Sequence, residues 1–479
     1  MPIFPPANYT DCSGITPHQQ FGKFLDNDLL QHICDESEKY AVFLGKPNSN
    51  VTVEELNVFI SILLVTEYNY HSQTRSLWST EEDLQNLMVV KSMRRNRFQQ
   101  ILHFLHFEDS RKKTTEKDKM WKLCPITDHL KANMIRNFHP EQHFSYDESM
   151  IAYFVKHGCK QFIKGKPLRF GYKVWSLCTP SGYLVNFEIY QGNNPRSNPQ
   201  YEAIFGKCAA PLLSMIDDFP PYVQELPLSF YFDNLFTGFP LLAYLKSRGY
   251  TSTGTIRQNR IPKNCPLPSK EEMTKKSRGF SVSSKLEGTD IVLTKWVDNS
   301  VVCALFTAYG KNPMFSVQRY SKEKKQKITV SRPCIIGQYN KYMGGMDQNV
   351  SLYRIGNRGK KWWSSIFTWL LDVSVQNAWQ LHRSAHPTMP QLEFRRSIAI
   401  FYAKHYGKEA RGSGPSRKRK TEDTVYEELR FDGLNHWPLP IEKKRRCAGL
   451  SCNSIGRTAC EKCNVGLCLK CFKKYHTIP

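Results

Sequence analysis

The chain has 479 residues, 40% of them hydrophobic, so it is long enough to form two or three domains with sizeable cores. Its 67 lysines and arginines outnumber 43 aspartates and glutamates, and the formal charge of +24 favours nucleic acid as a partner, although charge can also serve solubility alone. No apolar stretch of about 18 residues is present, and the first residues lack a secretory pattern, so we expect an intracellular protein that spans no membrane.

Residues 1–140 are expected to form a helical region. Apolar residues recur there at intervals of three and four, as between Phe24 and Ile33 and again between Val53 and Leu64. This spacing is typical of amphipathic helices that bury one face against a core. The alternating pattern of strands begins only near residue 141.

Three aspartates occupy positions suited to a metal site. Asp147 lies in an alternating segment typical of a half-buried strand, Asp233 ends an aromatic run of strand length, and Asp347 follows a glycine pair where a helix could begin. Magnesium prefers oxygen ligands, and two ions about 3.5–4 Å apart can activate the attacking oxygen and stabilise the leaving one in phosphoryl transfer. The alternative for each aspartate is a turn or a helix cap.

Residues 141–405 are expected to form an α/β core around these aspartates. Two further strands, at 170–178 and 183–190, flank a turn rich in proline and glycine, and a helix is expected around residues 200–215. From about residue 256 to 330, short β-like runs alternate with lysines and arginines and predict a β-rich insertion.

A cationic segment follows the third aspartate. Residues 353–363 contain two glycines, four basic side chains and two tryptophans, a composition suited to holding a DNA backbone near the site. The basic residues of this segment that we expect to contact DNA are Arg354, Arg358, Lys360 and Lys361.

Residues 406–435 are expected to form a basic linker. Glycine, serine and proline at 412–416 precede the tetrad Arg417 to Lys420, and a second basic cluster spans Lys443 to Arg446. Short basic runs in such a setting fit a nuclear import signal, so we expect a nuclear protein, although a phosphate-binding arm has the same composition.

Residues 436–479 are expected to form a small zinc-binding domain, because they concentrate soft metal ligands. Six of the fifteen cysteines lie in the last 33 residues. The ligands are Cys447, Cys452, Cys460, Cys463, Cys468, Cys471 and His476. A structural zinc site needs four ligands, so seven suggest two zinc ions and one further ligand. His436 is the nearest candidate, although a turn histidine without a metal role is an equal alternative.

Four blocks together resemble the piggyBac family of transposases over most of the chain. They are YFDNLFT (231–237), GTIR (254–257), YNKYMGG (339–345) and RGKKWW (358–363). The resemblance implies a ribonuclease-H-like core with a β-rich insertion, catalytic Asp147, Asp233 and Asp347 on two magnesium ions, and cutting at element ends with joining to TTAA targets. It also implies a helical N-terminal region that dimerises and contacts DNA, DNA binding by Arg257 of the second block, and a cysteine-rich tail that binds terminal DNA.

One departure from the family pattern bears on activity. The family usually has two aspartates after the glycine pair, spaced three residues apart, whereas this chain has Asp347 alone. Two interpretations are therefore open: an active transposase that handles double-stranded DNA as a homodimer, or a transposase-derived protein that binds specific DNA without cutting it. The cysteine-rich tail leaves protein recruitment open as well.

Overall fold

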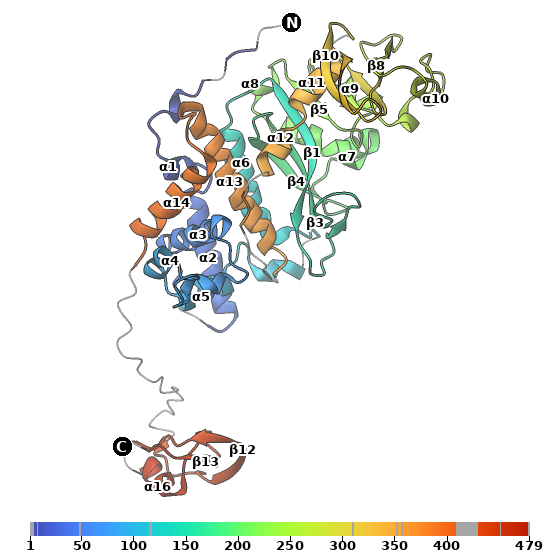
Figure 1. Ribbon diagram of the computed structural model, residues 1–479. Helices are drawn as coiled ribbons and strands as arrows, with labels where there is room; N and C mark the ends of the chain where they lie inside the picture. The colour runs from blue at the N-terminus through green and yellow to red at the C-terminus, as the bar shows by residue number, and fades with distance from the viewer. Residues whose placement is uncertain are drawn as a thin grey trace. The chain divides into compact units, whose positions relative to one another are not determined.

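The computed structural model describes residues 4–6, 8–46, 49–114, 117–308, 311–350, 353–355, 359, 361–408, 430–450 and 452–477. The chain forms two compact units, Met1–Ala410 and Arg411–Pro479, and each is described by itself (Figure 1). Among the described residues, no helix is both long and apolar enough to cross a membrane.

The first unit begins with the helical region that the apolar spacing predicts. Its α-helices are α1 (Pro17–Gly22), α2 (Asn27–Phe43), α3 (Val53–Tyr68), α4 (Leu87–Ser92), α5 (Arg95–Phe104) and α6 (Cys124–Arg136). Thr52 and Glu55 form a reciprocal capping box at the start of α3. Helix α3 is buried from residue 56 to residue 66 and packs against α14 (Gln391–His405), with the Ser61 hydroxyl donating to the Ala399 carbonyl at 2.8 Å.

A mixed nine-stranded sheet forms the centre of the first unit. Its strands are β1 (His143–Ala152), β2 (Gln161–Phe162), β3 (Phe170–Cys178), β4 (Leu184–Ile189), β5 (Ser229–Phe232), β6 (Thr251–Thr255), β7 (Ser281–Lys285), β8 (Val292–Val297) and β9 (Val301–Phe306). The order is β2-β3-β1-β5-β6-β9-β8-β7, and β4 pairs with β3. Strand β1 runs antiparallel to β3 and parallel to β5, which is parallel to β6. The predicted α/β class is confirmed.

Helices cover both faces of this sheet. On one face, the Tyr146 hydroxyl donates to the Cys208 carbonyl of α7 (Pro199–Asp217), and α9 (Phe239–Ser247) packs against β6. On the other, α12 (Gly345–Val350) and α13 (Ser364–Ala385) lie against β1 (Figure 1). The ring of Phe187 in β4 packs against Trp369 of α13 with centroids 5.1 Å apart. Because Asp147, Ser176 and Phe187 are paired across β1, β3 and β4, Asp147 is on the α13 face.

The region predicted as an insertion contributes in two ways. Strands β7, β8 and β9 extend the central sheet from β6, where Thr253 pairs with Phe306. The hairpin β10 (Met314–Ser321) and β11 (Gln326–Pro333) forms a separate two-stranded sheet. Trp296 is buried, and its indole nitrogen donates to the Ser331 carbonyl at 2.8 Å, so it joins the two parts by packing. The first unit also contains the short helices α8 (Pro221–Gln224), α10 (Lys270–Thr274) and α11 (Cys334–Tyr342).

The second unit is small and has little regular structure. It contains the antiparallel pair β12 (Pro438–Arg446) and β13 (Ile455–Cys460), followed by α16 (Leu469–Thr477). Its buried cluster consists mainly of cysteines, with Val465 and Leu467. So small an apolar core cannot offset the conformational entropy of folding, so the unit needs cross-links or metal.

Candidate functional site

Asp147 and Asp233 lie next to each other on the central sheet. Strands β1 and β5 are parallel, and Tyr146 pairs with Phe232, so the residues that follow are neighbours. Both carboxylates are on the face of the sheet that carries α12. Two aspartates separated by more than eighty residues thus converge because their strands are adjacent and in register, as the sequence predicts for a shared site.

Both carboxylates titrate above their usual range. Burial, the Asp233 charge and the Glu148 charge raise the pKa of Asp147 from 3.8 to about 6, against a hydrogen bond from the Glu148 amide. Burial and the Glu148 charge also raise the pKa of Asp233. Crowded, partly buried carboxylates of this kind are costly to ionise alone, and a divalent cation would relieve that cost. The pair therefore fits a hard cation such as magnesium.

A lysine near the pair, Lys166, was given no place in the site by sequence reasoning. Glu148 forms ion pairs with Lys173 at 2.7 Å and with Lys166 at 3.6 Å. The Lys166 charge lowers the pKa of both aspartates. The signals were present in the sequence, since Glu148 directly follows Asp147 and Lys166 belongs to a lysine-rich stretch.

The loop after Asp233 is held by two arginines. Arg260 Nη1 donates to the carbonyls of Asn234, Leu235 and Thr237 at 3.1, 3.0 and 2.8 Å. Arg257 Nε donates to Asn234 Oδ1 at 2.9 Å, and its charge lowers the pKa of Asp233. The predicted DNA contact Arg257 is thus an exposed residue beside the carboxylate pair.

Asp347 is the predicted ligand that the structure does not bring into the same cluster. Helix α12 contacts the sheet through Gly345, Met346 and Asn349, which are buried, whereas Asp347 is exposed. A β-carbon at Gly345 would lie 2.2 Å from the Thr179 carbonyl, which explains the glycine. The oxygens of Asp147, Asp233 and Asp347, all described residues, do not lie within 4.8 Å of one another. Helix α12 is on the correct face, and its carboxylate is exposed to solvent.

Helix α11 supplies an aromatic wall that the sequence did not indicate. The His143 ring stacks on Tyr342 at 3.7 Å, and the Tyr231 hydroxyl lies 3.3 Å from His143 Nδ1. Tyr339 hydrogen bonds to Thr255, and burial, with the charges of both aspartates, raises its pKa to about 12. Tyr339 is therefore a neutral phenol beside the carboxylate pair.

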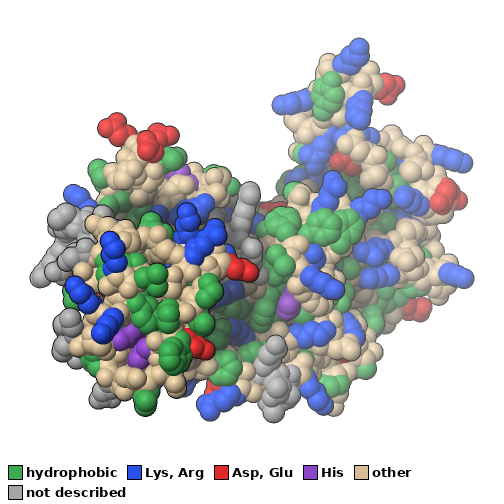
Figure 2. All heavy atoms as spheres, turned by 90° about the horizontal axis from the view of Figure 1, so that it is seen from below, with side chains coloured by type: hydrophobic (Ala, Val, Ile, Leu, Met, Phe, Trp, Pro, Cys, Tyr) green, Lys and Arg blue, Asp and Glu red, His purple; other side chains and the backbone are tan. Residues whose placement is uncertain are grey.

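The predicted basic segment is only partly described. Arg354 is exposed, whereas Lys361 Nζ donates to the carbonyls of Leu102 and His103 at 3.1 and 2.8 Å. Burial lowers the pKa of Lys361. Arg358, Lys360 and the tetrad Arg417 to Lys420 lie outside the described residues. On the face drawn in Figure 2, lysine and arginine side chains are far more abundant than acidic ones.

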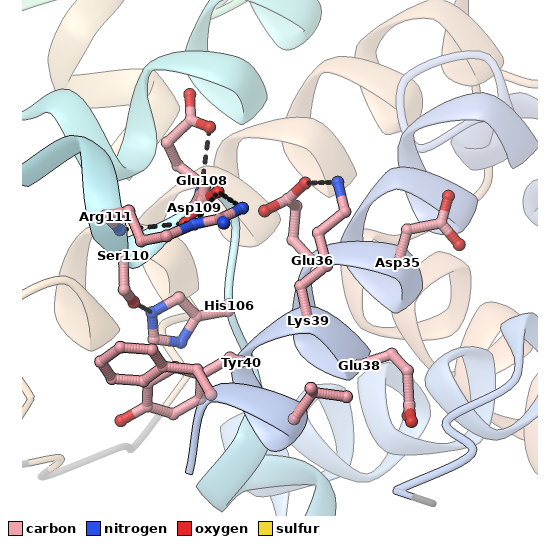
Figure 3. Close-up of a pocket in the computed structure, with 12 residues that line it drawn as sticks. Asp35, Glu36, Glu38, Lys39, Tyr40, His106, Glu108, Asp109, Ser110 and Arg111 are labelled. Atoms are coloured by element: carbon pink, nitrogen blue, oxygen red, sulfur yellow. Dashed lines mark hydrogen bonds and ion pairs between the residues drawn. The ribbon is translucent and has the colours of Figure 1, made fainter. Parts of the chain in front are cut away.

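An acidic cavity of about 460 Å³ lies in the helical region, lined by residues of α2 and of the segment 106–111 (Figure 3). Its carboxylates pair with nearby cations, as Glu36 does with Lys39 at 2.6 Å and Asp109 with Arg111 at 2.6 Å. His106 stacks on Tyr40 there, and burial lowers its pKa to about 3. None of the predicted site residues lines this cavity.

The second unit brings its eight predicted metal ligands together in two groups of four. Cys447, Cys452, Cys468 and Cys471 form the first group, and His436, Cys460, Cys463 and His476 form the second. Within each group the ligand atoms all lie within 4.8 Å of one another. The groups interleave along the chain, and His436 belongs to the second group, with its Nδ1 3.4 Å from the sulfurs of Cys460 and Cys463.

Backbone amides point at these sulfurs as well. The amides of Gly449 and Cys468 donate to Cys447 Sγ at 3.4 and 3.3 Å. A β-carbon at Gly449 would lie 2.8 Å from that of Cys471, so only glycine fits there. Four thiolates in one group and two thiolates with two imidazoles in the other fit tetrahedral zinc, which would cross-link the unit.

The chain falls in the class of transposases, since a family model described as Transposase IS4 matches residues 16–379. It is 36% identical over 468 residues to human PiggyBac transposable element-derived protein 3, covering 96% of this chain and 76% of that one. Identity to human PiggyBac transposable element-derived protein 2 is 34% over 470 residues, with the same coverages. The chain belongs to the piggyBac family of transposases, as the resemblance of the four blocks indicates.

A solved structure shares the fold. The chain is similar to a piggyBac transposase in a cryo-EM synaptic complex with hairpin DNA, with a TM-score of 0.69 and 18% identity. The match covers 96% of this chain and 98% of the other.

Proposed function

We propose that this chain is a DNA transposase that uses divalent metal to cut and join DNA strands at element ends, with TTAA targets. The observation that carries the proposal is the adjacent pair of Asp147 and Asp233, held in register on parallel strands within a piggyBac-family fold. Family membership supplies the substrate class, and the carboxylate pair supplies a place for the chemistry.

The strand arrangement supports a ribonuclease-H-like core. The part of the sheet ordered β4-β3-β1-β5-β6 has three antiparallel strands followed by two strands parallel to β1. In chain order β1 is the first and β5 the fourth of these five strands, and Asp147 in β1 lies beside Asp233, which directly follows β5. This placement agrees with the one expected for metal ligands in such a core.

In the proposed reaction, Asp147 and Asp233 hold the metal, and Asp347 joins them if its carboxylate comes within reach of the same metal. Two bound magnesium ions would supply activation of the attacking oxygen and charge neutralisation at the phosphate. Lys166 and Lys173 balance the charge of Glu148, which leaves the two aspartates as the free anionic ligands. Arg260 fixes the loop that follows Asp233, so the carboxylate keeps its position when DNA enters.

Binding of double-stranded DNA belongs to the same proposal. The structural neighbour is a complex with hairpin DNA, and this chain carries a formal charge of +24. The exposed basic end of β12, Lys443 to Arg446, supports contacts of the zinc unit with terminal DNA, and Arg257 and Arg354 support contacts near the carboxylates. Two chains would act on paired ends as a homodimer, and the tetrad Arg417 to Lys420 supports nuclear import.

The test is cleavage of labelled duplexes that carry piggyBac-type terminal repeats next to TTAA. With magnesium, the purified full-length chain is expected to nick the ends and form hairpins, whereas Asp147→Asn and Asp233→Asn bind the same duplex without nicking it. Asp83→Asn, at an exposed aspartate outside the site, is the matched control. Wild-type binding without nicking would overturn the enzymatic part of the proposal.

A second function is favoured by one specific observation, the position of the exposed Asp347 outside a common group with Asp147 and Asp233. If α12 keeps that position on DNA, the third ligand is lost, and the chain would act as a sequence-specific DNA-binding protein derived from a transposase. The Asp347→Asn variant separates the two functions. It abolishes cleavage in the enzyme, whereas in the binding protein wild type and variant give identical gel shifts and neither cuts.

A further inference from the structure

A third group of metal-ligand atoms lies in the first unit, far in sequence from the cysteine-rich tail. Asp11 and Cys12 are in a short 3-10 helix (Thr10–Cys12), and His139 lies between α6 and β1. Asp11 Oδ1 is 3.3 Å from His139 Nε2 and 3.6 Å from Cys12 Sγ, and the sulfur is 3.8 Å from the same nitrogen. One oxygen, one sulfur and one nitrogen thus form a nearly equilateral triangle.

These edges match those of a zinc tetrahedron. Zinc binds sulfur at about 2.3 Å and imidazole nitrogen or carboxylate oxygen at about 2.0–2.2 Å, which places tetrahedral ligands roughly 3.3–3.6 Å apart. The observed edges of 3.3, 3.6 and 3.8 Å differ from this range by 0.2 Å at most. Hydrogen bonds and an ion pair among the three side chains have the same separations, so zinc content decides between the two arrangements.

We propose that Asp11 Oδ1, Cys12 Sγ and His139 Nε2 bind a zinc ion, with water as the fourth ligand. Cys12 loses its thiol proton to solvent when the metal binds, so thiolate and carboxylate together neutralise the ion. The other Asp11 oxygen, Oδ2, is 3.6 Å from Lys23 Nζ, so the lysine does not compete for Oδ1. This site is independent of the proposed DNA chemistry.

The surroundings suit a bound ion. Cys12 is fully buried, and the Tyr9 ring packs against His139 with centroids 4.6 Å apart, which orients the imidazole. A cavity of about 380 Å³ is lined by His139, together with Tyr9 and Glu141. Asp11 is the more exposed ligand, with 58% of its side chain accessible, so the ion can enter from its side.

The ion would fasten the N-terminal segment to the catalytic sheet. His139 precedes β1 by only a few residues, and β1 carries Asp147. Without the ion, the same three side chains are joined by the contacts of Cys12 with Asp11, His139 with Asp11 and Cys12 with His139. A metal cross-link between residues 127 positions apart in sequence is stronger than these contacts and limits opening of the N-terminal segment.

The test counts zinc in the full-length chain after gel filtration, by plasma mass spectrometry. Wild type is expected to hold one more zinc per chain than Cys12→Ser or His139→Gln, whatever the loading of the C-terminal unit. Cys34→Ser is the matched control, because Cys34 is also a buried free cysteine of the helical region but belongs to no ligand group. Equal zinc content in all four proteins would overturn the proposal.

A second measurement keeps the test decisive if a variant folds poorly. Replacing zinc by cobalt in the wild-type chain gives thiolate-to-cobalt absorption in proportion to the cysteine sulfurs bound. The wild-type spectrum should contain a fraction that is missing from Asp11→Asn, a change at an exposed ligand that keeps every cysteine of the chain. Identical absorption per chain in the two proteins would show hydrogen bonds only and reject the site.

Discussion

The carboxylate pair and the cysteine-rich unit hold their ligands in different ways. Asp147 and Asp233 are brought together by a parallel strand pairing inside a large sheet with an extensive apolar core. The eight ligands of the second unit lie within 41 consecutive residues, from His436 to His476, around a core of mainly cysteines. The folded sheet alone positions the two aspartates, whereas we expect the second unit to need metal in its ligand groups in order to fold.

Removing metal should therefore unfold the second unit and leave the sheet of the first unit folded. Chelation with a strong zinc chelator is expected to unfold residues 430–477, since apparent zinc free energies in such small modules reach about 10–16 kcal/mol, while the sheet of the first unit keeps its structure. Limited proteolysis followed by mass spectrometry checks this, with cleavage expected between β12 and α16 and not within β1 to β6.

Single substitutions sharpen the same contrast. Cys463→Ser should produce the local unfolding without chelator, whereas Cys265→Ser, at a partly exposed cysteine outside both groups, should leave the unit intact. Unchanged protease resistance of the chelated wild-type chain would mean that the two units do not differ in the way described.

The carboxylate pair should be essential for strand cleavage, and its charges should add nothing favourable to the free energy of unfolding. Asp147→Asn and Asp233→Asn are each expected to lower the rate of strand cleavage by about 10³-fold or more, because a metal ligand is worth several kcal/mol in the transition state. Single-turnover cleavage of labelled duplexes measures this, and gel shifts of the same samples confirm that DNA binding persists. A loss of less than about tenfold would remove the pair from the active site.

The free energy of unfolding should depend on pH in the direction that the raised pKa of Asp147 sets. Its pKa is raised from 3.8 to about 6 in the folded chain, so the folded state holds a proton that the unfolded state has released between these values. Without added magnesium, stability falls as pH rises through this window, by on the order of 2 kcal/mol, and stays lower above it. Asp147→Asn should lack this part of the decline in thermal unfolding between pH 4 and 7.5, and Asp83→Asn should retain it.

The sequence predicted these two regions with unequal completeness. Cysteine spacing predicted the six cysteines and His476 that the structure places in two groups, and the count of seven made His436 a candidate, with a turn histidine as the equal alternative. Candidate ligands that lie close together in the chain can be recognised from their spacing. Strand patterns also placed Asp147 and Asp233. What they could not give is the solvent exposure of Asp347, which follows from the packing of α12 through the buried Met346 and Asn349.

The role of Lys361 was beyond prediction for the same reason. The composition of residues 353–363 is typical of a DNA-contacting segment. The ammonium group of Lys361 nevertheless donates to two carbonyls at the end of α5, more than 250 residues away. Lys166 and Tyr339 likewise join the site only through tertiary contacts. Distance in sequence, more than residue type, decided which parts of the site could be foreseen.

Arg260 offers a smaller test of how the fold holds the carboxylates. Arg260→Met removes the three hydrogen bonds to the loop after Asp233, and we expect cleavage to slow by about tenfold with a modest loss of stability, since hydrogen bonds to a charged group contribute about 1.5–3 kcal/mol when buried and less here. Raising the magnesium concentration should recover part of the rate. Arg260→Lys keeps the charge, so a full rate in that variant would show that charge and not loop geometry matters.

The smallest expected effect separates a DNA contact from a structural lysine. Arg354→Ala should weaken binding to all duplexes uniformly and lower the slope of log affinity against log salt by about one, because one phosphate contact is lost. Lys361→Ala should instead lower the melting temperature, since its ammonium donates to the carbonyls of Leu102 and His103, and leave the salt slope unchanged. Fluorescence anisotropy at several salt concentrations, paired with thermal unfolding, measures both. The reverse result, a changed slope for Lys361→Ala alone, would mean that Lys361 leaves its carbonyl partners for phosphate when DNA binds.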